Sequence, residues 1–249
     1  MGRLHLDPVH PFFPSSIEVI AFDADDTLWD CQSHFEQVER ALYDALSTWC
    51  TAEEAASSLF STEQANMSLL GYGSKAFTLS VLETALRVSD NAIDGDTLSR
   101  LHAMGKHLSE MPATPLPGVV DTLTTLCSQW QPAAAHRRLV AFTKGELLEQ
   151  QNKMIRSTLL PFFDHVEIVS SKGERECEAL CRHLQISPSQ MLMVGNSFKS
   201  DISPALTVGC WAAYIPFHVV WQLERSEEYS HPRLARLSSI SQLPALLQC

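Results

Sequence analysis

Acidic, hydroxyl and lysine side chains directly follow four apolar runs in this 249-residue sequence. The first run, Ile17–Phe22, leads into the pentapeptide Asp-Ala-Asp-Asp-Thr, which begins at Asp23. Later runs lead into Thr143-Lys144-Gly145, Ser170-Ser171-Lys172-Gly173 and Gly195-Asn196-Ser197, the last followed by Ser200-Asp201. In open sheets of parallel strands, ligands bind beyond the carboxyl ends of the strands. We therefore expect these four groups to share one edge of a sheet and to form a site there.

Each group also has a purely structural interpretation when taken alone. An Asp-x-Asp sequence can cap a helix, a Thr-Lys-Gly sequence can form a turn, and Ser197 can be a helix N-cap. Together, however, the groups exceed what caps and turns need. Three acids within four residues, with a further acid at another strand end, repel one another, and that repulsion favours a bound cation.

Five short apolar runs predict the strands that would position these groups. Several are continuously hydrophobic, as is typical of parallel strands covered on both faces. The predicted strands are Ile17–Phe22, Leu139–Phe142, Val166–Val169, Met191–Val194 and Trp211–Ile215, and helical spacing separates them at Gly118–Trp130, Glu146–Leu159, Glu174–Leu184 and Lys199–Val208. This alternation predicts an α/β fold with a doubly wound parallel sheet and right-handed crossovers.

One segment interrupts the alternation of strand and helix. Between Cys31 and Met111 the pattern predicts no strand and four helices, at Ser33–Trp49, Ala52–Leu70, Lys75–Val88 and Thr97–Ser109. A boundary rich in proline follows, ending at Gly118. We therefore predict an all-helical subdomain of residues 31–111, inserted into an α/β core made of residues 1–30 and 112–249.

Composition excludes several classes of function. Eighteen Lys and Arg residues against 29 Asp and Glu give a net charge of −11, which argues against nucleic-acid binding, because that requires clustered cations. No apolar run approaches the ~18–20 residues of a membrane span, and the first 16 residues contain no signal-peptide core. We expect no membrane partner.

The seven cysteines indicate free thiols rather than a disulfide framework, because their number is odd and the chain is not short. Cys177 and Cys181 share a helical face, but neither a second cysteine pair nor a histidine cluster with metal-ligand spacing accompanies them. Together these features favour a reducing, cytoplasmic location. Gly71-Tyr72-Gly73-Ser74-Lys75-Ala76 matches a loose dinucleotide fingerprint, but it lacks the preceding buried strand that such a site needs.

The groups at the strand ends resemble the motifs of the haloacid dehalogenase (HAD) superfamily, in its phosphatase branch. Asp23 to Thr27 resembles the first motif, D-x-D-x-T, while Thr143 and Lys172 resemble the second and third. Residues 195–201 resemble the acidic fourth motif, and the helical insert resembles the first-type (C1) helical cap between motifs one and two. The resemblance covers residues 17–215 and implies a Rossmann-like core.

This resemblance implies a Mg²⁺-dependent phosphomonoester hydrolase that acts on a small phosphorylated metabolite through an aspartyl-phosphate. Asp23 would attack phosphorus, and Asp25 would protonate the departing alcohol and later accept a proton from water. Thr143 and the backbone amides of Lys144 and Gly145 would bind the phosphoryl group. The remaining expected roles are substrate contact by Thr27, charge neutralisation by Lys172, and Mg²⁺ ligation by Asp23, Asp25, Asn196 and Asp201.

Charge supports the need for a metal ion at such a site. Asp23, Asp25 and Asp201 would face a doubly charged phosphate ester with Lys172 as the one cation. Like charges 4 Å apart cost ~4 kcal/mol at an effective dielectric constant of ~20, so several such pairs disfavour metal-free binding. Mg²⁺ suits carboxylate oxygens combined with substrate phosphate.

The resemblance leaves the metal ligands and the exact reaction open. The fourth motif carries Asn196 where the family often has an acid, so Asn196, Asp201 or both complete the metal sphere. The dehalogenases of the family lack the second Asp, because a halide leaves without a proton, so Asp25 favours phosphoester hydrolysis. The sequence is also compatible with a receiver-like module, a non-catalytic phospholigand-binding protein or a phosphomutase, and it does not decide between a monomer and a homodimer.

Substrate choice is expected to lie in the helical insert, because a lid supplies specificity contacts and excludes water. Its most loop-like piece is residues 71–75, where Lys75 either reaches an anionic substrate group or lies in solvent. His218 and Trp221 follow the last predicted strand and are candidates for the same rim. For Asp26 we expect only a surface or capping position.

Overall fold

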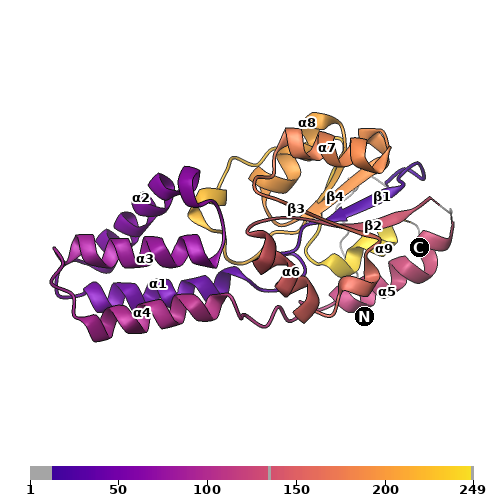
Figure 1. The fold of residues 1–249 in the computed structure, drawn as a ribbon. Coiled ribbons are helices and arrows are strands. Elements are labelled where there is room, and N and C mark those ends of the chain that lie inside the picture. Colours follow the sequence, from indigo (N-terminus) through magenta and orange to yellow (C-terminus); the bar gives the residue numbers. More distant parts are fainter. Residues whose placement is uncertain (1–12, 134–135, 248–249) are drawn as a thin grey trace, which may run out of the picture.

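A computed structural model describes residues 13–133 and 136–247 of the chain. Figure 1 shows two parts, a sheet flanked by helices and an elongated bundle of four helices. The six strands pair in parallel in the order β3-β2-β1-β4-β5-β6. Their bounds are β1 Val19–Phe22, β2 Arg138–Lys144, β3 His165–Val169, β4 Met191–Gly195, β5 Trp211–Tyr214 and β6 Leu234–Arg236. The doubly wound α/β prediction is therefore confirmed.

Alternate residues of the central strand β1 pack on opposite faces of the sheet, because side chains of a strand alternate in direction. Ile20 and Phe22 join a cluster that also contains Leu123 of α5 and Leu243 of α9, whereas Val19 and Ala21 join one that contains Leu180 of α7. The helices of this part are α5 Val119–Thr125, α6 Leu147–Arg156, α7 Glu174–Leu184, α8 Ser203–Val208 and α9 Leu243–Leu246.

Short 3-10 and π-helical turns make up the remaining secondary structure. Two of the helices predicted from the sequence are each part α-helix and part π turn. The π turns are Leu126–Trp130 and Phe198–Ile202, and the 3-10 turns are Gln131–Ala133, Leu160–Phe162, Pro188–Gln190, Gln222–Glu224 and Ile240–Gln242. The predicted helix Lys199–Val208 is therefore a π turn that continues into α8. Strand β6 was not predicted, because three residues are too few to show a pattern.

The four helices between β1 and β2 are α1 Gln32–Leu46, α2 Ala52–Leu70, α3 Ser74–Val88 and α4 Gly95–Leu108. Their buried side chains form a hydrophobic cluster of their own, which includes Leu42, Leu59, Val81 and Leu101. Local sequence fixes their starts: Thr51 and Glu54 form a reciprocal capping box at α2, and the Asp94 side chain caps α4. We call this bundle the cap below.

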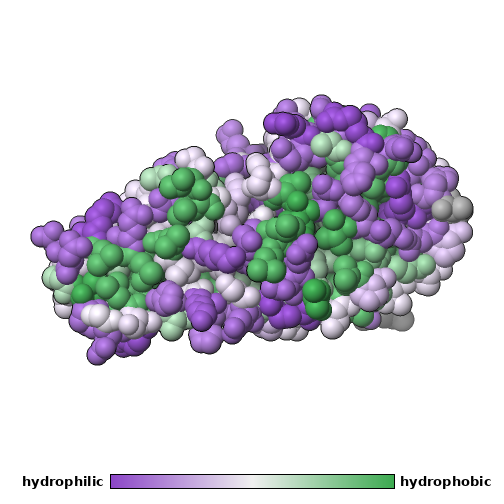
Figure 2. All heavy atoms as spheres, viewed as in Figure 1, coloured by the Kyte–Doolittle hydropathy of each residue, from purple (hydrophilic) through white to green (hydrophobic). Residues whose placement is uncertain are grey.

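The surface of the molecule is mostly hydrophilic, with hydrophobic side chains gathered over α6 and over parts of the cap (Figure 2). Leu147, Leu148 and Ile155 of α6 are each more than half exposed. Among the described residues, none of the helices combines the length and the apolar character that crossing a membrane requires.

Gly105 lets α4 pack closely against α3, and its replacement provides a stability test. A Cβ at this position would lie 2.3 Å from Oγ1 and 2.5 Å from Cγ2 of Thr78. Alanine gains ~1 kcal/mol in helix propensity, but overpacking a well-filled contact costs ~1–3 kcal/mol. We expect Gly105→Ala to lower the free energy of unfolding by about 1 kcal/mol in urea denaturation, and Thr78→Ala in the same chain to recover part of the loss. A variant that is as stable as the parent would contradict this packing.

Candidate active site

The ends of three strands and one side of the cap enclose a pocket of about 160 Å³. Its core side is lined by residues from the predicted groups, namely Asp23, Asp25, Asp26, Thr143, Lys144, Gly145, Asn196, Ser197, Ser200 and Asp201. These residues follow or end β1, β2 and β4, which are neighbours in the sheet. The parallel topology therefore brings together groups that lie more than 170 residues apart in the chain.

Lys172 joins two of the pocket carboxylates from beneath the pocket and is not itself among the lining residues. Its Nζ lies 2.8 Å from Asp23 Oδ1 and 2.7 Å from Asp201 Oδ1, and its side chain is fully buried. Burial and the charge of Asp201 raise the pKa of Asp23 to about 7, against the opposing effect of Lys172. Burial alone would lower the pKa of Lys172, but Asp201 and Asp23 together raise it. A buried ammonium between two carboxylates fixes the orientation of both.

Asp201 is held firmly in this arrangement by the backbone as well. Its Oδ2 accepts a hydrogen bond from the Ser197 amide at 2.9 Å, so both of its oxygens are occupied. The carboxylate packs directly over Gly195, where a Cβ would lie 2.2 Å from Oδ2. The glycine at the end of β4 is thus required for this close approach.

Asp25 is surrounded by donors that the sequence analysis did not identify. Lys153 Nζ lies 2.8 Å from Oδ1 and 2.7 Å from Oδ2, Trp29 Nε1 donates to Oδ1 at 2.7 Å, and Gln150 Nε2 donates to Oδ2 at 2.8 Å. Burial alone would raise the pKa of Asp25, but Lys153, Gln150 and Trp29 together lower it. Asp25 is therefore held as a carboxylate.

Three oxygens from two strand ends face one another beside Asp23. The Asn196 side chain places Oδ1 at 3.2 Å from the Asp25 carbonyl oxygen and at 3.2 Å from Asp23 Oδ2. Turning the amide over would present Nδ2 to both oxygens as a donor instead. Thr27 Oγ1 lies 3.1 Å from both Asp23 Oδ2 and Asn196 Oδ1, so Thr27 supports these groups and does not line the pocket.

The phosphoryl-binding groups expected after β2 are only partly available. The Thr143 side chain is nearly fully buried, yet its hydroxyl forms no hydrogen bond with any residue that the structure describes. In contrast, the Gly145 amide donates to the Val169 carbonyl at 3.0 Å. The expectation that the Gly145 amide is free to bind a ligand is therefore wrong in this conformation, because the amide continues the β2–β3 ladder.

Glu224, which the sequence analysis did not identify, organises the other side of the strand ends. Its carboxylate pairs with Lys144 Nζ and accepts hydrogen bonds from Ser197 Oγ at 2.6 Å and Ser200 Oγ at 2.5 Å. Lys144 Nζ also lies 2.7 Å from Ser200 Oγ and 4.5 Å from the centre of the Tyr72 ring. No pattern in the polar stretch around Glu224 distinguishes it from solvated acids nearby.

The cap reaches the pocket through its 71–75 turn, but not through Lys75. Lys75 pairs with Glu146 at 3.2 Å, is 60% exposed, and is not among the lining residues, so it lies at the surface. Instead Ser74 donates to Glu149 Oε2 of α6 through both its amide, at 2.8 Å, and its hydroxyl, at 2.7 Å. These bonds hold the cap against α6.

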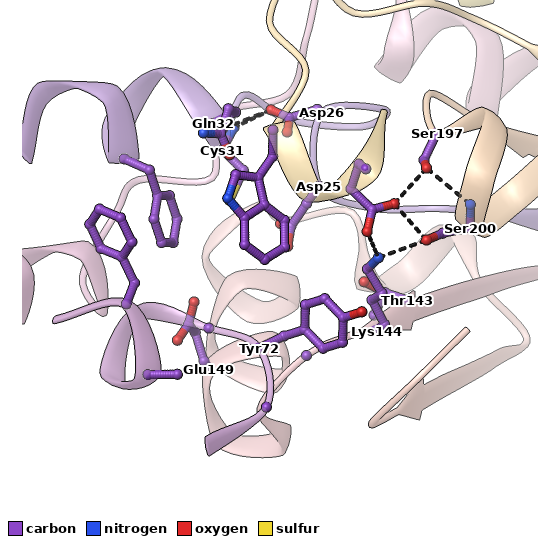
Figure 3. Close-up of a pocket in the computed structure, with 18 of the residues that line it drawn as sticks. Asp25, Asp26, Cys31, Gln32, Tyr72, Thr143, Lys144, Glu149, Ser197 and Ser200 are labelled. Atoms are coloured by element: carbon purple, nitrogen blue, oxygen red, sulfur yellow. Dashed lines mark hydrogen bonds and ion pairs between the residues drawn. The ribbon is translucent and has the colours of Figure 1, made fainter. Parts of the chain in front are cut away.

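The remaining candidate residues, Trp221, His218 and Asp26, have different positions relative to the pocket. Trp221 lines the pocket and packs edge-on against Tyr72 at 5.9 Å between ring centres, whereas His218 is not among the lining residues. Asp26 takes the capping position: its Oδ1 accepts hydrogen bonds from the amides of Cys31 and Gln32 at the start of α1 (Figure 3). Burial raises the pKa of Asp26 to about 7.

The fold also assembles a histidine cluster that sequence spacing did not reveal. His165 and Glu167 of β3 approach His183 of α7, with Glu167 Oε2 lying 2.8 Å from His165 Nε2 and 3.3 Å from His183 Nδ1. The cluster is partly exposed and does not line the pocket. Two residues from a strand and one from the next helix become neighbours only through the tertiary fold.

Comparisons with known proteins find solved structures of similar fold. A haloacid dehalogenase-like family hydrolase from Xanthomonas campestris is 27% identical, with a TM-score of 0.82 over 94% of this chain and 91% of that one. The magnesium-bound putative HAD-hydrolase YfnB from Bacillus subtilis is 16% identical, with a TM-score of 0.64 over 94% and 99%. An L-2-haloacid dehalogenase from Xanthobacter autotrophicus is 18% identical, with a TM-score of 0.61 over 93% and 98%.

No curated protein matches the sequence. A model of the haloacid dehalogenase-like hydrolases matches residues 17–209, which span the cap and all four groups at the strand ends. The chain therefore belongs to the family of haloacid dehalogenase-like hydrolases.

Proposed function

We propose that the protein is a Mg²⁺-dependent phosphomonoester hydrolase that acts on a small phosphorylated metabolite through an aspartyl-phosphate on Asp23. The observation that carries the proposal is the convergence of Asp23 Oδ2, the Asp25 carbonyl oxygen and Asn196 Oδ1. The single hydrogen of the Thr27 hydroxyl serves only one of Asp23 Oδ2 and Asn196 Oδ1 at a time, and Asn196 Oδ1 faces the Asp25 carbonyl oxygen directly. Such close oxygens repel one another, and a cation removes that penalty.

The spacing of these oxygens fits Mg²⁺. Octahedral ligands about 2.0–2.1 Å from the ion lie about 3 Å from their neighbours, close to the 3.2 Å that separates Asn196 Oδ1 from each of the other two oxygens. We assign the fourth-motif ligand to Asn196, because its Oδ1 lies 3.2 Å from both Asp23 Oδ2 and the Asp25 carbonyl oxygen, whereas Asp201 pairs with the buried Lys172 and the Ser197 amide. When bound, Mg²⁺ would offset phosphoryl charge and orient a phosphoryl oxygen.

The other residues have complementary tasks in this proposal. Asp23 attacks phosphorus, and the alcohol leaves as the new bond from Oδ forms. The unpaired Thr143 hydroxyl donates to a phosphoryl oxygen, while Lys172 balances the charge of Asp23 and keeps its carboxylate in place. Lys172 stays in place beneath the pocket, because Asp201 also pairs with it.

Asp25 serves as the acid and base of the two half-reactions. The carboxylate form held by Lys153 and Gln150 is the one that takes a proton from the hydrolytic water. Protonating the departing alcohol in the first step requires Asp25 to gain a proton and to give up one of its present donors. General acid–base assistance of this kind contributes ~10²–10⁴-fold in rate.

Haloacid dehalogenation is the main competing reaction within the family, because dehalogenases are among the similar structures. Displacement of a halide by a carboxylate needs neither a general acid nor a metal ion. Asp25 and the three converging oxygens would then have no chemical task, so phosphomonoester hydrolysis accounts for more of the site.

Asp23→Asn provides the direct test of the nucleophile. We expect the variant to lose at least ~10³-fold in Mg²⁺-dependent turnover of p-nitrophenyl phosphate, because an amide cannot form the acyl phosphate. Its melting temperature should stay close to that of the parent, since Lys172 keeps Asp201 as a partner. Retained turnover in a homogeneous preparation would rule out Asp23 as the nucleophile.

Replacements in the fourth motif test the metal ligand. A carboxylate binds Mg²⁺ more strongly than a carboxamide, so Asn196→Asp should lower the Mg²⁺ concentration for half-maximal activity by about tenfold, or ~1.4 kcal/mol. Asp201→Asn, the matched control, should leave that concentration nearly unchanged while lowering turnover. The opposite pattern in a Mg²⁺ titration would assign the ligand role to Asp201.

A further inference from the structure

The cap side of the pocket contains a second group of residues that the phosphoryl chemistry does not use. Phe35 and Glu39 of α1, Glu63 of α2 and Phe77 of α3 line it, and Tyr72 and Trp221 lie at its edge. The same pocket contains Asp23 and Thr143, so the part of a substrate beyond its phosphate would enter this space.

Glu63 is the unusual member of this group. It is only 8% exposed, and it forms no ion pair with any residue in the described ranges. Among the described residues the Trp221 indole is the donor that favours its charged form, and most of the hydrogen-bonding capacity of the carboxylate is unused. Burial, with a smaller effect of Glu39, raises the pKa of Glu63 to about 7, as expected for an acid without a cation.

The two lysines that line the pocket already form ion pairs with carboxylates other than Glu63. Lys144 pairs with Glu224, and Lys153 pairs with Asp25 and lies 3.6 Å from Glu149. Among the described lining residues these are the only lysines or arginines, and both belong to the core. Nothing on the cap side would therefore balance a second anionic group on a substrate.

A buried polar atom on the core side also lacks a partner. Gln150 lines the pocket and is 2% exposed, and its Oε1 forms no hydrogen bond although Nε2 has two acceptors. Gln150 Oε1 itself has almost no accessible surface, so the acceptors open to a substrate group on the cap side are the carboxylates of Glu63 and Glu39. Aromatic rings add a further preference, because their faces attract cations.

We propose that Glu63, with Glu39 and the surrounding aromatic rings, forms a subsite for a cationic leaving group, so that the substrate is a phosphate monoester of a small amino alcohol. This inference rests on the proposed function for the reaction, but it concerns binding that is measurable without turnover. The pocket volume of about 160 Å³ fits a small substrate, since a cavity of about 150 Å³ holds benzene.

A series of esters tests the proposal. We would measure dissociation constants by calorimetry and kcat/KM with Mg²⁺ for ω-aminoalkyl, ω-hydroxyalkyl and ω-carboxyalkyl phosphates of two to five carbons. At the best chain length, the amino ester should exceed the hydroxy ester by about tenfold and the carboxy ester by at least 100-fold. Because the alkyl chain is varied, the test does not depend on knowing the distance from phosphorus to Glu63.

Variants then identify the residues that cause the preference for the amino ester. Glu63→Gln should reduce the advantage of the amino over the hydroxy ester to less than about twofold, and Glu39→Gln should reduce it partly. Glu53→Gln removes the same charge from an exposed position of the same helix and should leave the ratio unchanged. Melting curves establish that each variant is folded.

The outcomes separate this inference from the proposed function. Tighter binding of the amino ester, lost in Glu63→Gln, but without turnover of any ester would support the subsite and contradict phosphatase activity. Turnover with equal or stronger preference for the carboxy ester would overturn the subsite and leave phosphatase activity standing. Absence of both binding and turnover for every ester would contradict both.

Discussion

Two buried lysines hold the carboxylates that the sheet brings together. Lys172 forms ion pairs with both Asp23 and Asp201, and Lys153 donates hydrogen bonds to both carboxylate oxygens of Asp25. Removing either lysine would cost ~3–5 kcal/mol, because buried carboxylates would be left without a compensating charge. The geometry of the site therefore depends on these ion pairs, and the oxygens left over, beside Asn196, are those available to a metal ion.

Helix α6 connects this charge arrangement to the cap. It supplies Gln150 and Lys153 to Asp25, and Glu149, which precedes Gln150, accepts two hydrogen bonds from Ser74 at the start of α3. The cap in turn places Glu63 over the pocket. In the proposed reaction, the catalytic groups come from the core and the leaving-group contacts from the cap, and α6 contacts both.

Much of the core was predictable because its signals are local. Continuous apolar strands followed by Asp23, Thr143, Lys172 and Asn196 predicted the parallel sheet and the edge where these residues meet. Lys153 and Glu224 were not predictable, because they look like ordinary polar residues of an amphipathic helix and a polar loop. Only the tertiary fold buries them against Asp25 and Lys144. The Gly145 amide was misassigned because its acceptor belongs to the neighbouring strand.

The most direct measurement is acid-quenched capture of the phosphorylated enzyme. The protein would be mixed with Mg²⁺ and a phosphate ester that it hydrolyses, and the reaction would be quenched in acid. The protein would then be digested, and the peptide that contains Asp23 would be analysed by mass spectrometry. We predict a phosphate on Asp23 that hydroxylamine removes and that does not form when Mg²⁺ is chelated. Phosphate on another residue, or turnover with no phosphorylated enzyme under conditions that slow its hydrolysis, would contradict the account.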